Sequence, residues 1–212
     1  MDKTRQAIET YNKRAGYYQI KFMDFENYKT KLEAFCNILS PGAKVLDVGC
    51  GPGNASKLLV ELNKEFKILG IDLSTEMVNR ARANVVSPNV QFLVGDIRDM
   101  NLMGEEYNAV IASFCLPHLS NMEAEKLLHD IGATLCEGGF LYLSCMEGSK
   151  SGFETTSFSP NDYIFFNYYS EGFIRELLRE NNLRIIQLQR DVYYESNGNT
   201  TIDMFYYAQK VT

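Results

Sequence analysis

The alternation of short apolar runs with helical patterns is the feature of this sequence that most restricts its fold. Five runs typical of β-strands follow residue 40, at 44–48, 67–71, 90–94, 109–112 and 140–144. Nearly continuous apolar strands suit a sheet that is covered on both faces. Between them, the apolar residues within 55–62 and 124–135 keep the i, i+3, i+4, i+7 spacing of a helix with one buried face. This rhythm predicts a doubly wound α/β domain with a largely parallel sheet.

Both ends of the chain depart from this alternation. Residues 1–39 predict two helices, and the tail predicts a helix around 173–178 followed by two strands. Asn197-Gly198 separates these last two β-rich runs, and this dipeptide is typical of a tight hairpin. We therefore expect the sheet to end in an antiparallel pair. No break in composition marks a second domain, so residues 1–212 are predicted to form one domain.

Composition excludes several classes of protein. Lys and Arg number 21 against 27 Asp and Glu, which gives a net charge of -6. A general nucleic-acid binder usually carries the opposite charge, so no nucleic-acid partner is expected. The chain lacks an apolar stretch of the ~18 residues that a membrane span needs, and its start lacks a signal-peptide pattern. We expect no membrane association and a cytoplasmic location.

The numbers and spacing of the cysteines and histidines argue against disulfide bonds and a metal site. The five cysteines are odd in number and show no C-x-x-C spacing, so neither a disulfide framework nor a zinc site is predicted. Free thiols suit a reducing compartment. Only two histidines are present, at positions 118 and 129, so a multi-histidine metal site is not available. No metal is expected.

The stretch Val-Leu-Asp-Val-Gly-Cys-Gly-Pro-Gly at residues 45–53 carries the strongest chemical signal. It leads from a strand into a helix, and its glycines let the backbone approach a ligand closely. Asp72 ends the second strand, where a carboxylate can accept hydrogen bonds from both hydroxyls of a ribose. Asp96 ends the third strand, where it can accept from the exocyclic amine of adenine. Together these residues predict a nucleoside pocket at the carboxyl ends of the strands.

A dinucleotide is a poorer match to this loop. The dinucleotide fingerprint is G-x-G-x-x-G, whereas this chain has G-x-G-x-G. Asp47 lies two residues before Gly49, where its charge disfavours a pyrophosphate and favours an ammonium group. A nicotinamide-dependent oxidoreductase therefore remains the weaker alternative.

These residues, with Gly95-Asp96-Ile97, the strand that ends at Ser113-Phe114, and the stretch 135–140, resemble the class I S-adenosylmethionine-dependent methyltransferases. The resemblance is strong over residues 40–145. It implies a seven-stranded sheet with an antiparallel last strand, S-adenosylmethionine as cofactor, and methyl transfer to a small-molecule acceptor whose O, N or C atom is undecided. A non-catalytic protein that binds S-adenosylmethionine is a further alternative.

The resemblance also implies where the cofactor binds. Its methionine end is placed over the glycine loop, its ribose on Asp72 and its adenine beside Asp96 and Ile97. The segment 11–18 is similar to the aromatic segment that covers the methionine end in many small-molecule members. The expected cofactor-binding residues are Tyr11, Tyr18, Asp47, Gly49, Cys50, Gly51, Asp72, Leu73, Asp96, Ile97, Ser113 and Phe114.

Two further features concern the acceptor. His118 follows the fourth strand, where the acceptor should arrive, and an imidazole can take a proton near neutral pH. Packing against the cofactor, or a hydrogen bond to a loop carbonyl, is the alternative, and we favour such a non-catalytic role. The connection at residues 150–170 is rich in aromatic residues and predicts a lid over the acceptor. A flap over the core or a homodimer contact is the alternative, and the oligomeric state is left open.

Overall fold

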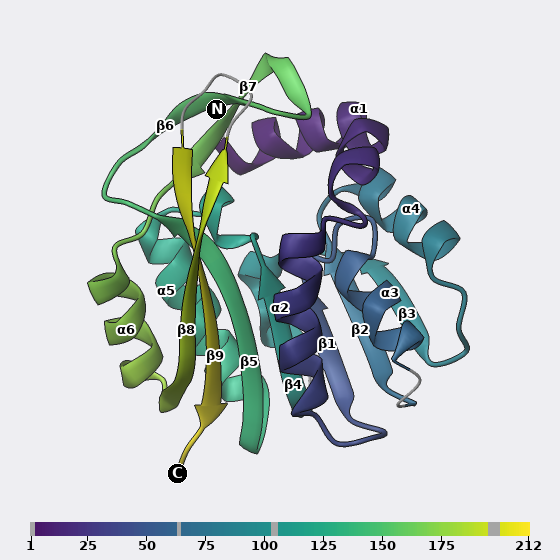
Figure 1. Ribbon diagram of the computed structural model, residues 1–212, viewed down its shortest axis with the longest axis vertical. Helices are drawn as coiled ribbons and strands as arrows, with labels where there is room; N and C mark the ends of the chain where they lie inside the picture. Colours follow the sequence, from purple (N-terminus) through teal and green to yellow (C-terminus); the bar gives the residue numbers. More distant parts are fainter. Residues whose placement is uncertain (1–2, 63–64, 103–105, 195–199) are drawn as a thin grey trace.

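The computed structural model describes residues 3–62, 65–102, 106–194 and 200–212. Its main sheet has seven strands in the spatial order β3-β2-β1-β4-β5-β9-β8 (Figure 1). The neighbouring strands from β3 to β5 pair in parallel, whereas β9 pairs antiparallel with both β5 and β8. The strands are β1 (Lys44–Val48), β2 (Lys67–Asp72), β3 (Val90–Val94), β4 (Tyr107–Ser113), β5 (Leu135–Glu147), β8 (Leu183–Tyr194) and β9 (Thr200–Lys210). The predicted doubly wound sheet with an antiparallel last strand is confirmed.

The predicted terminal hairpin is also visible in the pairing of its strands. Strand β8 pairs with β9 along its whole length, from Leu183 opposite Lys210 to Tyr194 opposite Thr200. The Asn197-Gly198 dipeptide itself lies outside the described residues. A short connection between two antiparallel strands requires that their pairing continue up to the ends that it joins, as it does here.

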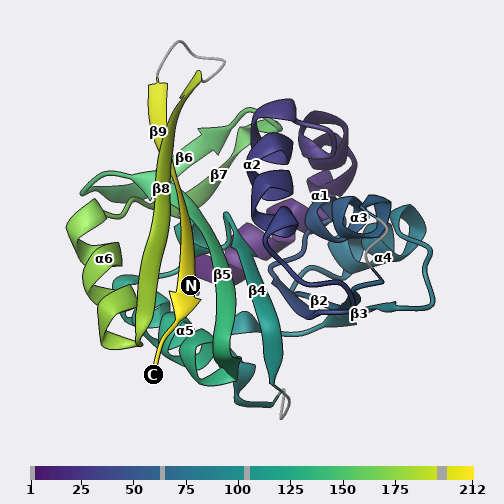
Figure 2. The same cartoon turned by 60° about the horizontal axis from the view of Figure 1, so that its bottom comes forward.

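The core lies in two layers, one on each face of the sheet. Along β1, Leu46 and Val48 belong to one hydrophobic cluster, and Val45 belongs to the other. The first cluster includes residues of α5 and α6, and the second includes residues of α2 and α3 (Figures 1 and 2). These helices are α2 (Glu26–Asn37), α3 (Asn54–Glu61), α5 (Asn121–Thr134) and α6 (Glu171–Glu180). Because successive strand residues point to opposite faces, both sides of each central strand are buried.

Side-chain caps fix where several helices begin. Ser120 accepts from the backbone N–H of Glu123, and the Glu123 carboxylate accepts from the N–H of Ser120, which together form a capping box at the start of α5. Ser74 caps α4 (Thr75–Asn84) by accepting from the N–H of Met77. Short 3-10 turns, η1 (Ile97–Leu102) and η2 (Leu116–His118), follow β3 and β4. The caps and turns therefore set the positions of residues at the carboxyl ends of the strands.

The aromatic segment, residues 150–170, is not a loop. It forms a separate antiparallel sheet of β6 (Ser151–Thr156) and β7 (Ser159–Asn167). Helix α1 (Lys3–Phe22) lies beside this hairpin above the carboxyl ends of the main strands (Figure 1). Asp162 accepts from Lys13 Nζ at 2.9 Å and from Arg14 Nε at 3.0 Å, which joins the hairpin to α1. Helix α1 and the β6–β7 hairpin together cover the edge of the sheet at which the main parallel strands end.

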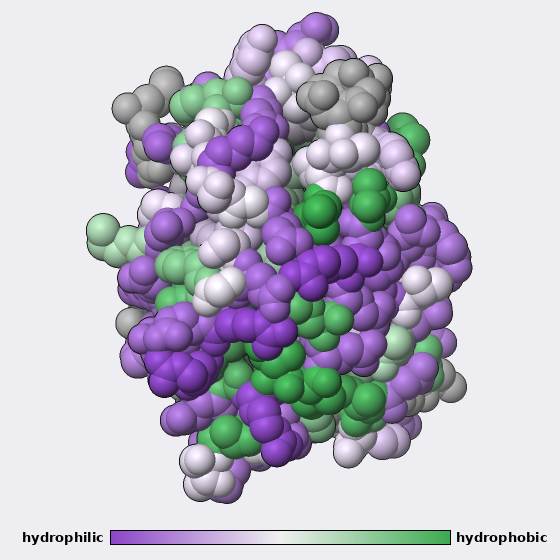
Figure 3. Space-filling view, turned by 60° about the vertical axis from the view of Figure 1, so that its left-hand side comes forward, coloured by the Kyte–Doolittle hydropathy of each residue, from purple (hydrophilic) through white to green (hydrophobic). Residues whose placement is uncertain are grey.

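Strand β8 forms one edge of the main sheet. Figure 3 shows the side of the molecule that carries α6 and β8, where hydrophilic residues surround smaller hydrophobic areas. Arg190 of β8 donates to Glu147 of β5 at 2.8 Å and also pairs with Glu171. Charged residues on an edge strand disfavour edge-to-edge pairing with another chain.

Three structural features bear on the expectations from composition. None of the described helices is long and apolar enough to cross a membrane. All five cysteines are free thiols, and only Cys136 is not buried. Within the described ranges, no group of three or more His, Cys, Asp or Glu residues is placed to hold a metal ion.

Candidate functional site

The glycine loop between β1 and α3 has little room for side chains. Gly49 has φ of +70°, and a Cβ there would lie only 2.7 Å from the Cβ of Cys115. Gly51 has φ of +54°, and a Cβ there would point toward the ring of Tyr18, 3.9 Å away. Positive φ values favour glycine, so both positions restrict the residue type. The loop backbone is therefore pressed against the segment after β4 and faces α1.

Cys50 lies between these glycines and is buried. Burial raises the pKa of its thiol well above the usual value. A protonated thiol is a poor nucleophile. The environment of Cys50 therefore fits a small packing residue in the loop.

Asp72 is positioned by two backbone hydrogen bonds at the end of β2. Its Oδ2 accepts from the N–H of Gly51 at 2.9 Å, and its Oδ1 accepts from the N–H of Ser74 at 2.8 Å. Burial raises the pKa of this carboxyl. Asn12 of α1 accepts from the Ser74 hydroxyl at 2.7 Å, so α1 is held against the same turn. One carboxylate thus links the glycine loop to the start of α4.

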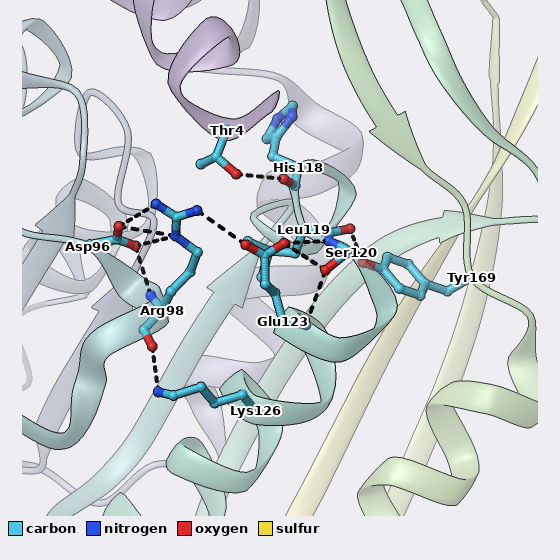
Figure 4. Close-up of polar contacts among 9 residues, drawn as sticks. All are labelled: Thr4, Asp96, Arg98, His118, Leu119, Ser120, Glu123, Lys126 and Tyr169. Atoms are coloured by element: carbon cyan, nitrogen blue, oxygen red, sulfur yellow. Dashed lines mark hydrogen bonds and ion pairs between the residues drawn. The ribbon is translucent and has the colours of Figure 1, made fainter. Parts of the chain in front are cut away.

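Asp96 is held by Arg98 (Figure 4). The guanidinium donates from Nε at 2.9 Å to Oδ1 and from Nη2 at 2.6 Å to Oδ2. Its Nη1 donates to Glu123 at 3.1 Å. Burial alone would raise the pKa of Asp96, but the hydrogen bonds from Arg98 outweigh it and hold the pKa below its usual value. Asp96 is therefore ionised, and any adenine amine would share this carboxylate with Arg98.

Asp47 is the buried carboxylate beneath the glycine loop, with 1% of its surface exposed. The hydroxyl of Ser56 donates to its Oδ2 at 2.7 Å. Burial raises the pKa of Asp47 to about 7, although the Ser56 hydrogen bond opposes the shift. This carboxyl is thus poised to change its charge near neutral pH.

His118 connects three parts of the site. Its Nε2 lies 2.7 Å from the hydroxyl of Tyr11 in α1, and its Nδ1 lies 3.3 Å from the carbonyl oxygen of Phe165 in β7. Thr4 donates to its backbone carbonyl at 3.4 Å (Figure 4). Burial lowers the pKa of His118 to about 4 and raises that of Tyr11, so both are neutral at pH 7. This assigns the proton to Nδ1, with Nε2 accepting from Tyr11.

This geometry bears on the role of His118. The nitrogen that could take a proton already accepts from Tyr11. A role as general base would require Tyr11 to move away first. The contacts favour a positioning role for His118, and its catalytic role stays a prediction.

Two adjoining cavities contain the predicted site. A cavity of about 850 Å³ lies between the glycine loop, α2, the end of β5 and the β6–β7 hairpin. A smaller one of about 90 Å³ lies beside Asp72 and Asp96. They share the lining residues Tyr11, Tyr18, Gly49, Gly51, Ser113, Phe114 and His118. Asp47 and Cys50 line only the larger cavity, whereas Asp72, Leu73, Asp96 and Ile97 line only the smaller one. The structure thus brings every predicted site residue to one of the two.

The aromatic residues of the hairpin region divide into different environments. Phe158 stacks on Tyr11 with 5.3 Å between ring centroids and contacts Tyr18 edge-on at 5.2 Å. Phe158 and Phe166 line the large cavity. Tyr169, by contrast, belongs to the main core and donates to the carbonyl oxygens of Leu116 and Leu119. The predicted lid therefore cannot extend to Tyr169.

Several lining residues were not singled out as site residues from the sequence. Tyr28 has the spacing of an ordinary core residue of α2, yet it lines the large cavity and donates to Asp203 at 2.8 Å. Asp203 interrupts an apolar strand, and that lone carboxylate was the signal available for it. Arg98 could have been suspected only from its closeness to Asp96 in the chain.

These features define an α/β protein with two adjoining cavities at the carboxyl ends of β1 to β4. Residues 45–139 match the model of the methyltransferase domain family. Together with the fold, this match identifies a class I S-adenosylmethionine-dependent methyltransferase domain in this part of the chain. S-adenosylmethionine is the cofactor of such domains.

Two curated relatives illustrate the likeness in sequence. The chain is 26% identical over 194 residues to protein 235L of Invertebrate iridescent virus 6, whose name describes a methyltransferase; the match covers 90% of this chain and 65% of that protein. It is 35% identical over 81 residues to trans-aconitate 2-methyltransferase of Rhodopseudomonas palustris, covering 36% of this chain and 30% of that enzyme. The chain thus spans less than two thirds of the length of these relatives.

A solved structure shows the same fold over the whole chain. Magnesium protoporphyrin IX methyltransferase of Synechocystis PCC 6803, with bound S-adenosylhomocysteine, superposes with a TM-score of 0.74 at 17% identity. The superposition covers 99% of this chain and 100% of that one. At this identity the likeness concerns the fold alone.

Proposed function

We propose that this protein transfers a methyl group from S-adenosylmethionine to a small-molecule acceptor. The observation that carries the proposal is the 850 Å³ cavity that adjoins the nucleoside pocket and shares its lining at Ser113, Phe114 and the glycine loop. A volume of this size lies within the ~300–1,000 Å³ typical of small-molecule sites. The cavity therefore offers room for an acceptor next to the methionine end of the cofactor.

The hydrogen-bond acceptors of the pocket fit the cofactor. Asp72 suits the ribose hydroxyls, Asp96 with Ile97 suits the adenine, and Asp47 suits the ammonium group of the methionine portion. When bound, the cofactor supplies a methyl group that its own positively charged sulfur activates. The protein then needs mainly to align the acceptor and exclude water. Tyr11, Tyr18 and Phe158 contribute a ring cluster to the lining of the large cavity, in which Tyr11 stacks on Phe158 and Tyr18 contacts both edge-on.

Two other functions could use this pocket. A nicotinamide-dependent oxidoreductase is disfavoured because the loop lacks the third glycine position and Asp47 lies beneath it. A protein that binds S-adenosylmethionine without transferring its methyl group would use the same pocket. The large adjoining cavity supports the enzyme over this second alternative.

Calorimetry and product assays distinguish the methyltransferase, the oxidoreductase and the non-catalytic binding protein. We expect the purified chain to bind S-adenosylmethionine and S-adenosylhomocysteine and not NAD. With pools of small-molecule acceptors, we expect release of S-adenosylhomocysteine. Binding of NAD in preference to S-adenosylmethionine would overturn the proposal, and binding without release in any pool would favour the non-catalytic protein.

We expect the affinity for S-adenosylmethionine to depend on pH through Asp47. The pKa of Asp47 is raised from 3.8 to about 7, so the carboxyl is protonated at pH 5 and ionised at pH 8. Affinity should therefore rise with pH up to about 7. It should fall again above ~8, where the cofactor's amino group loses its proton. Calorimetry at pH 5 to 9 measures this profile.

The control for this experiment is Asp24→Asn. Asp24 is an exposed carboxylate at the cavity mouth that pairs with Lys57, and its removal should leave the profile unchanged. Asp47→Asn should flatten the acidic limb and lower the affinity at pH 8. An acidic limb that persists in Asp47→Asn would refute this assignment.

The proposed lid is the β6–β7 hairpin with Phe158 at its turn. Phe158→Ala should lower the rate of S-adenosylhomocysteine release and weaken acceptor binding, because the ring closes the large cavity against Tyr11 and Tyr18. Phe153→Ala is the matched control, since this ring is 46% exposed and lies outside the lining. Steady-state kinetics of both variants measure the effect. Equal kinetics for the two would remove the hairpin from the site.

The acceptor of one relative can be compared with the cavity. The Rhodopseudomonas palustris relative is named for trans-aconitate, a tricarboxylate. Among the residues that the structure describes, the cavity lining has lysines but no arginine, and Lys57 and Lys150 lie within 4.0 Å of Glu or Asp oxygens. An acceptor with several negative charges would find few free cations. We infer a different acceptor for this chain.

A further inference from the structure

Four aromatic rings follow one another in the lining of the large cavity. They belong to Phe22 at the end of α1, Phe25 just before α2, Tyr28 in α2 and Phe114 just after β4. In this order, neighbouring ring centroids lie 6.2, 4.7 and 4.8 Å apart. We call these four residues the ring wall. Two segments that are far apart in the chain thus form one continuous aromatic part of the lining.

The ring wall adjoins the proposed cofactor pocket at Phe114. Of the two cavities, Phe22, Phe25 and Tyr28 line only the larger, whereas Phe114 also lines the smaller one beside Asp72. A ligand that lies on the ring wall would therefore meet the cofactor at Phe114. In the proposed methyl transfer, the ring wall belongs to the part of the cavity that receives the acceptor.

The backbone of Phe114 holds its ring at this boundary. Phe114 has φ of +52°, an unusual value for a residue with a bulky side chain. Its N–H donates to Ser144 Oγ at 3.0 Å, which fixes this conformation. Strained residues persist where their surroundings fix them, and they cluster at functional sites. The conformation of Phe114 therefore supports a role for its ring in binding a ligand.

The hydrophobic core supports the ring wall from behind. Phe205 of β9 is fully buried, and its ring contacts both Tyr28 and Phe114 at 5.8 Å between centroids. The four residues of the ring wall, in contrast, are only partly buried. A ring that the core fixes and that still has exposed surface in a cavity is preorganised to bind a ligand. Little side-chain freedom is then lost on binding.

The ring wall offers a ligand mainly ring surface. The hydroxyl of Tyr28 already donates to Asp203 Oδ2 at 2.8 Å, and a phenol has one proton to donate. The other three residues are phenylalanines, whose side chains have no hydrogen-bonding group. Aromatic pairs in stacked or edge-to-face arrangements gain more than the burial of their apolar area provides. A flat aromatic ligand would therefore gain most from these rings.

We propose that the methyl acceptor has a planar aromatic body that packs on the rings of Phe25, Tyr28 and Phe114. This proposal rests on the proposed methyl transfer and names the substrate class of the same cavity. Phe114 and Tyr28 place the aromatic body beside the cofactor, and Phe25 extends the contact. A saturated body of the same size would bury similar apolar area without the ring pairing. The ring wall thus selects planar acceptors over puckered ones.

Two probes with one skeleton test the proposal: 2-naphthylmethanol and its fully saturated counterpart, decahydro-2-naphthylmethanol. Calorimetry measures their binding to the full chain saturated with S-adenosylhomocysteine. We expect the aromatic probe to bind about fivefold or more tightly. Because the saturated probe is the more hydrophobic of the two, transfer from water alone would give the opposite order. Equal or tighter binding of the saturated probe, or no binding of the aromatic one, would overturn the proposal.

A pair of variants at Tyr28 locates the binding of the probes. Tyr28→Phe and Tyr28→Leu both remove the hydroxyl that donates to Asp203, but only Tyr28→Leu removes the ring. Tyr28→Phe should keep the preference for the aromatic probe, whereas Tyr28→Leu should bring the two affinities to within about twofold. Phe25→Leu removes a second ring and should reduce the preference in the same direction. Full retention of the preference in the leucine variants that fold would also overturn the proposal.

Tyr194→Leu is the matched control for the leucine variants. Tyr194 is 76% exposed and lies outside the cavity lining, so this variant should keep the wild-type preference. All these variants should keep the wild-type affinity for S-adenosylhomocysteine, which also reports that each is folded. If S-adenosylhomocysteine fails to bind the wild-type chain, the proposed function fails. If it binds and the aromatic preference is absent, only the acceptor class is wrong.

Discussion

Asp72→Ala is expected to lower the affinity for S-adenosylmethionine by about two orders of magnitude or more. A carboxylate at this position can accept from both ribose hydroxyls, and each hydrogen bond to a charged group is worth roughly 1.5–3 kcal/mol. The variant also releases the N–H of Gly51 and the N–H of Ser74, which Asp72 now holds. The loop under the cofactor would lose a support together with the ribose contact. Calorimetry on the folded variant measures the loss.

Two further variants separate these contributions. Asp72→Asn keeps the size of the side chain but offers one acceptor oxygen, so its affinity should lie between the wild type and Asp72→Ala. Glu76→Gln removes an exposed carboxylate in the first turn of α4 and should leave the affinity unchanged. An affinity of Asp72→Ala within about twofold of the wild type would contradict a ribose-binding role.

Tyr169→Ala is expected to destabilise the fold by about 3–5 kcal/mol, the usual cost of truncating a large buried aromatic side chain. Tyr169 is 1% exposed, and its hydroxyl donates to Leu116 at 2.9 Å and to Leu119 at 2.8 Å. Both acceptors belong to the segment after β4 that also carries His118. Chemical denaturation with circular dichroism measures the change in the free energy of unfolding.

The comparison variants follow from the two parts of this side chain. Tyr169→Phe keeps the ring and removes the hydroxyl, so its cost should be about 1 kcal/mol or somewhat more. Tyr163→Ala truncates a tyrosine of β7 that is 60% exposed and should change stability little. A loss in Tyr169→Ala as small as that in Tyr163→Ala would show that the residue is part of a loosely held flap after all.

The sheet could be predicted because its signals are local. Each central strand is a short apolar run that ends in a turn, and each run needs no knowledge of distant residues to be recognised. The β6–β7 hairpin lacks such a signal. In its first strand, Ser151–Thr156, the one apolar residue apart from glycine is Phe153, which is exposed. The residues along this strand alternate between exposed and partly buried. The sequence therefore predicted an aromatic-rich connection where the structure has two strands.

The residues of the site also divide into those with a local sequence signal and those without one. Gly49, Gly51 and Asp72 follow directly from strand ends, and parallel strands bring their carboxyl ends to one edge. Tyr28 and Asp203 are 175 residues apart and meet because α2 packs against β9. No pattern along the chain links them. The capture of Asp96 by Arg98 is local, but the third partner, Glu123, comes from α5.

The bridge at His118 has a consequence for how two ligands would influence each other. Tyr11 lines both cavities, Phe165 belongs to the hairpin beside the large cavity, and one neutral imidazole contacts both. Displacing either element breaks a hydrogen bond to the same ring. Any free energy of coupling that passes through this ring must be reciprocal: the factor by which the first ligand changes the affinity of the second equals the factor in the opposite order.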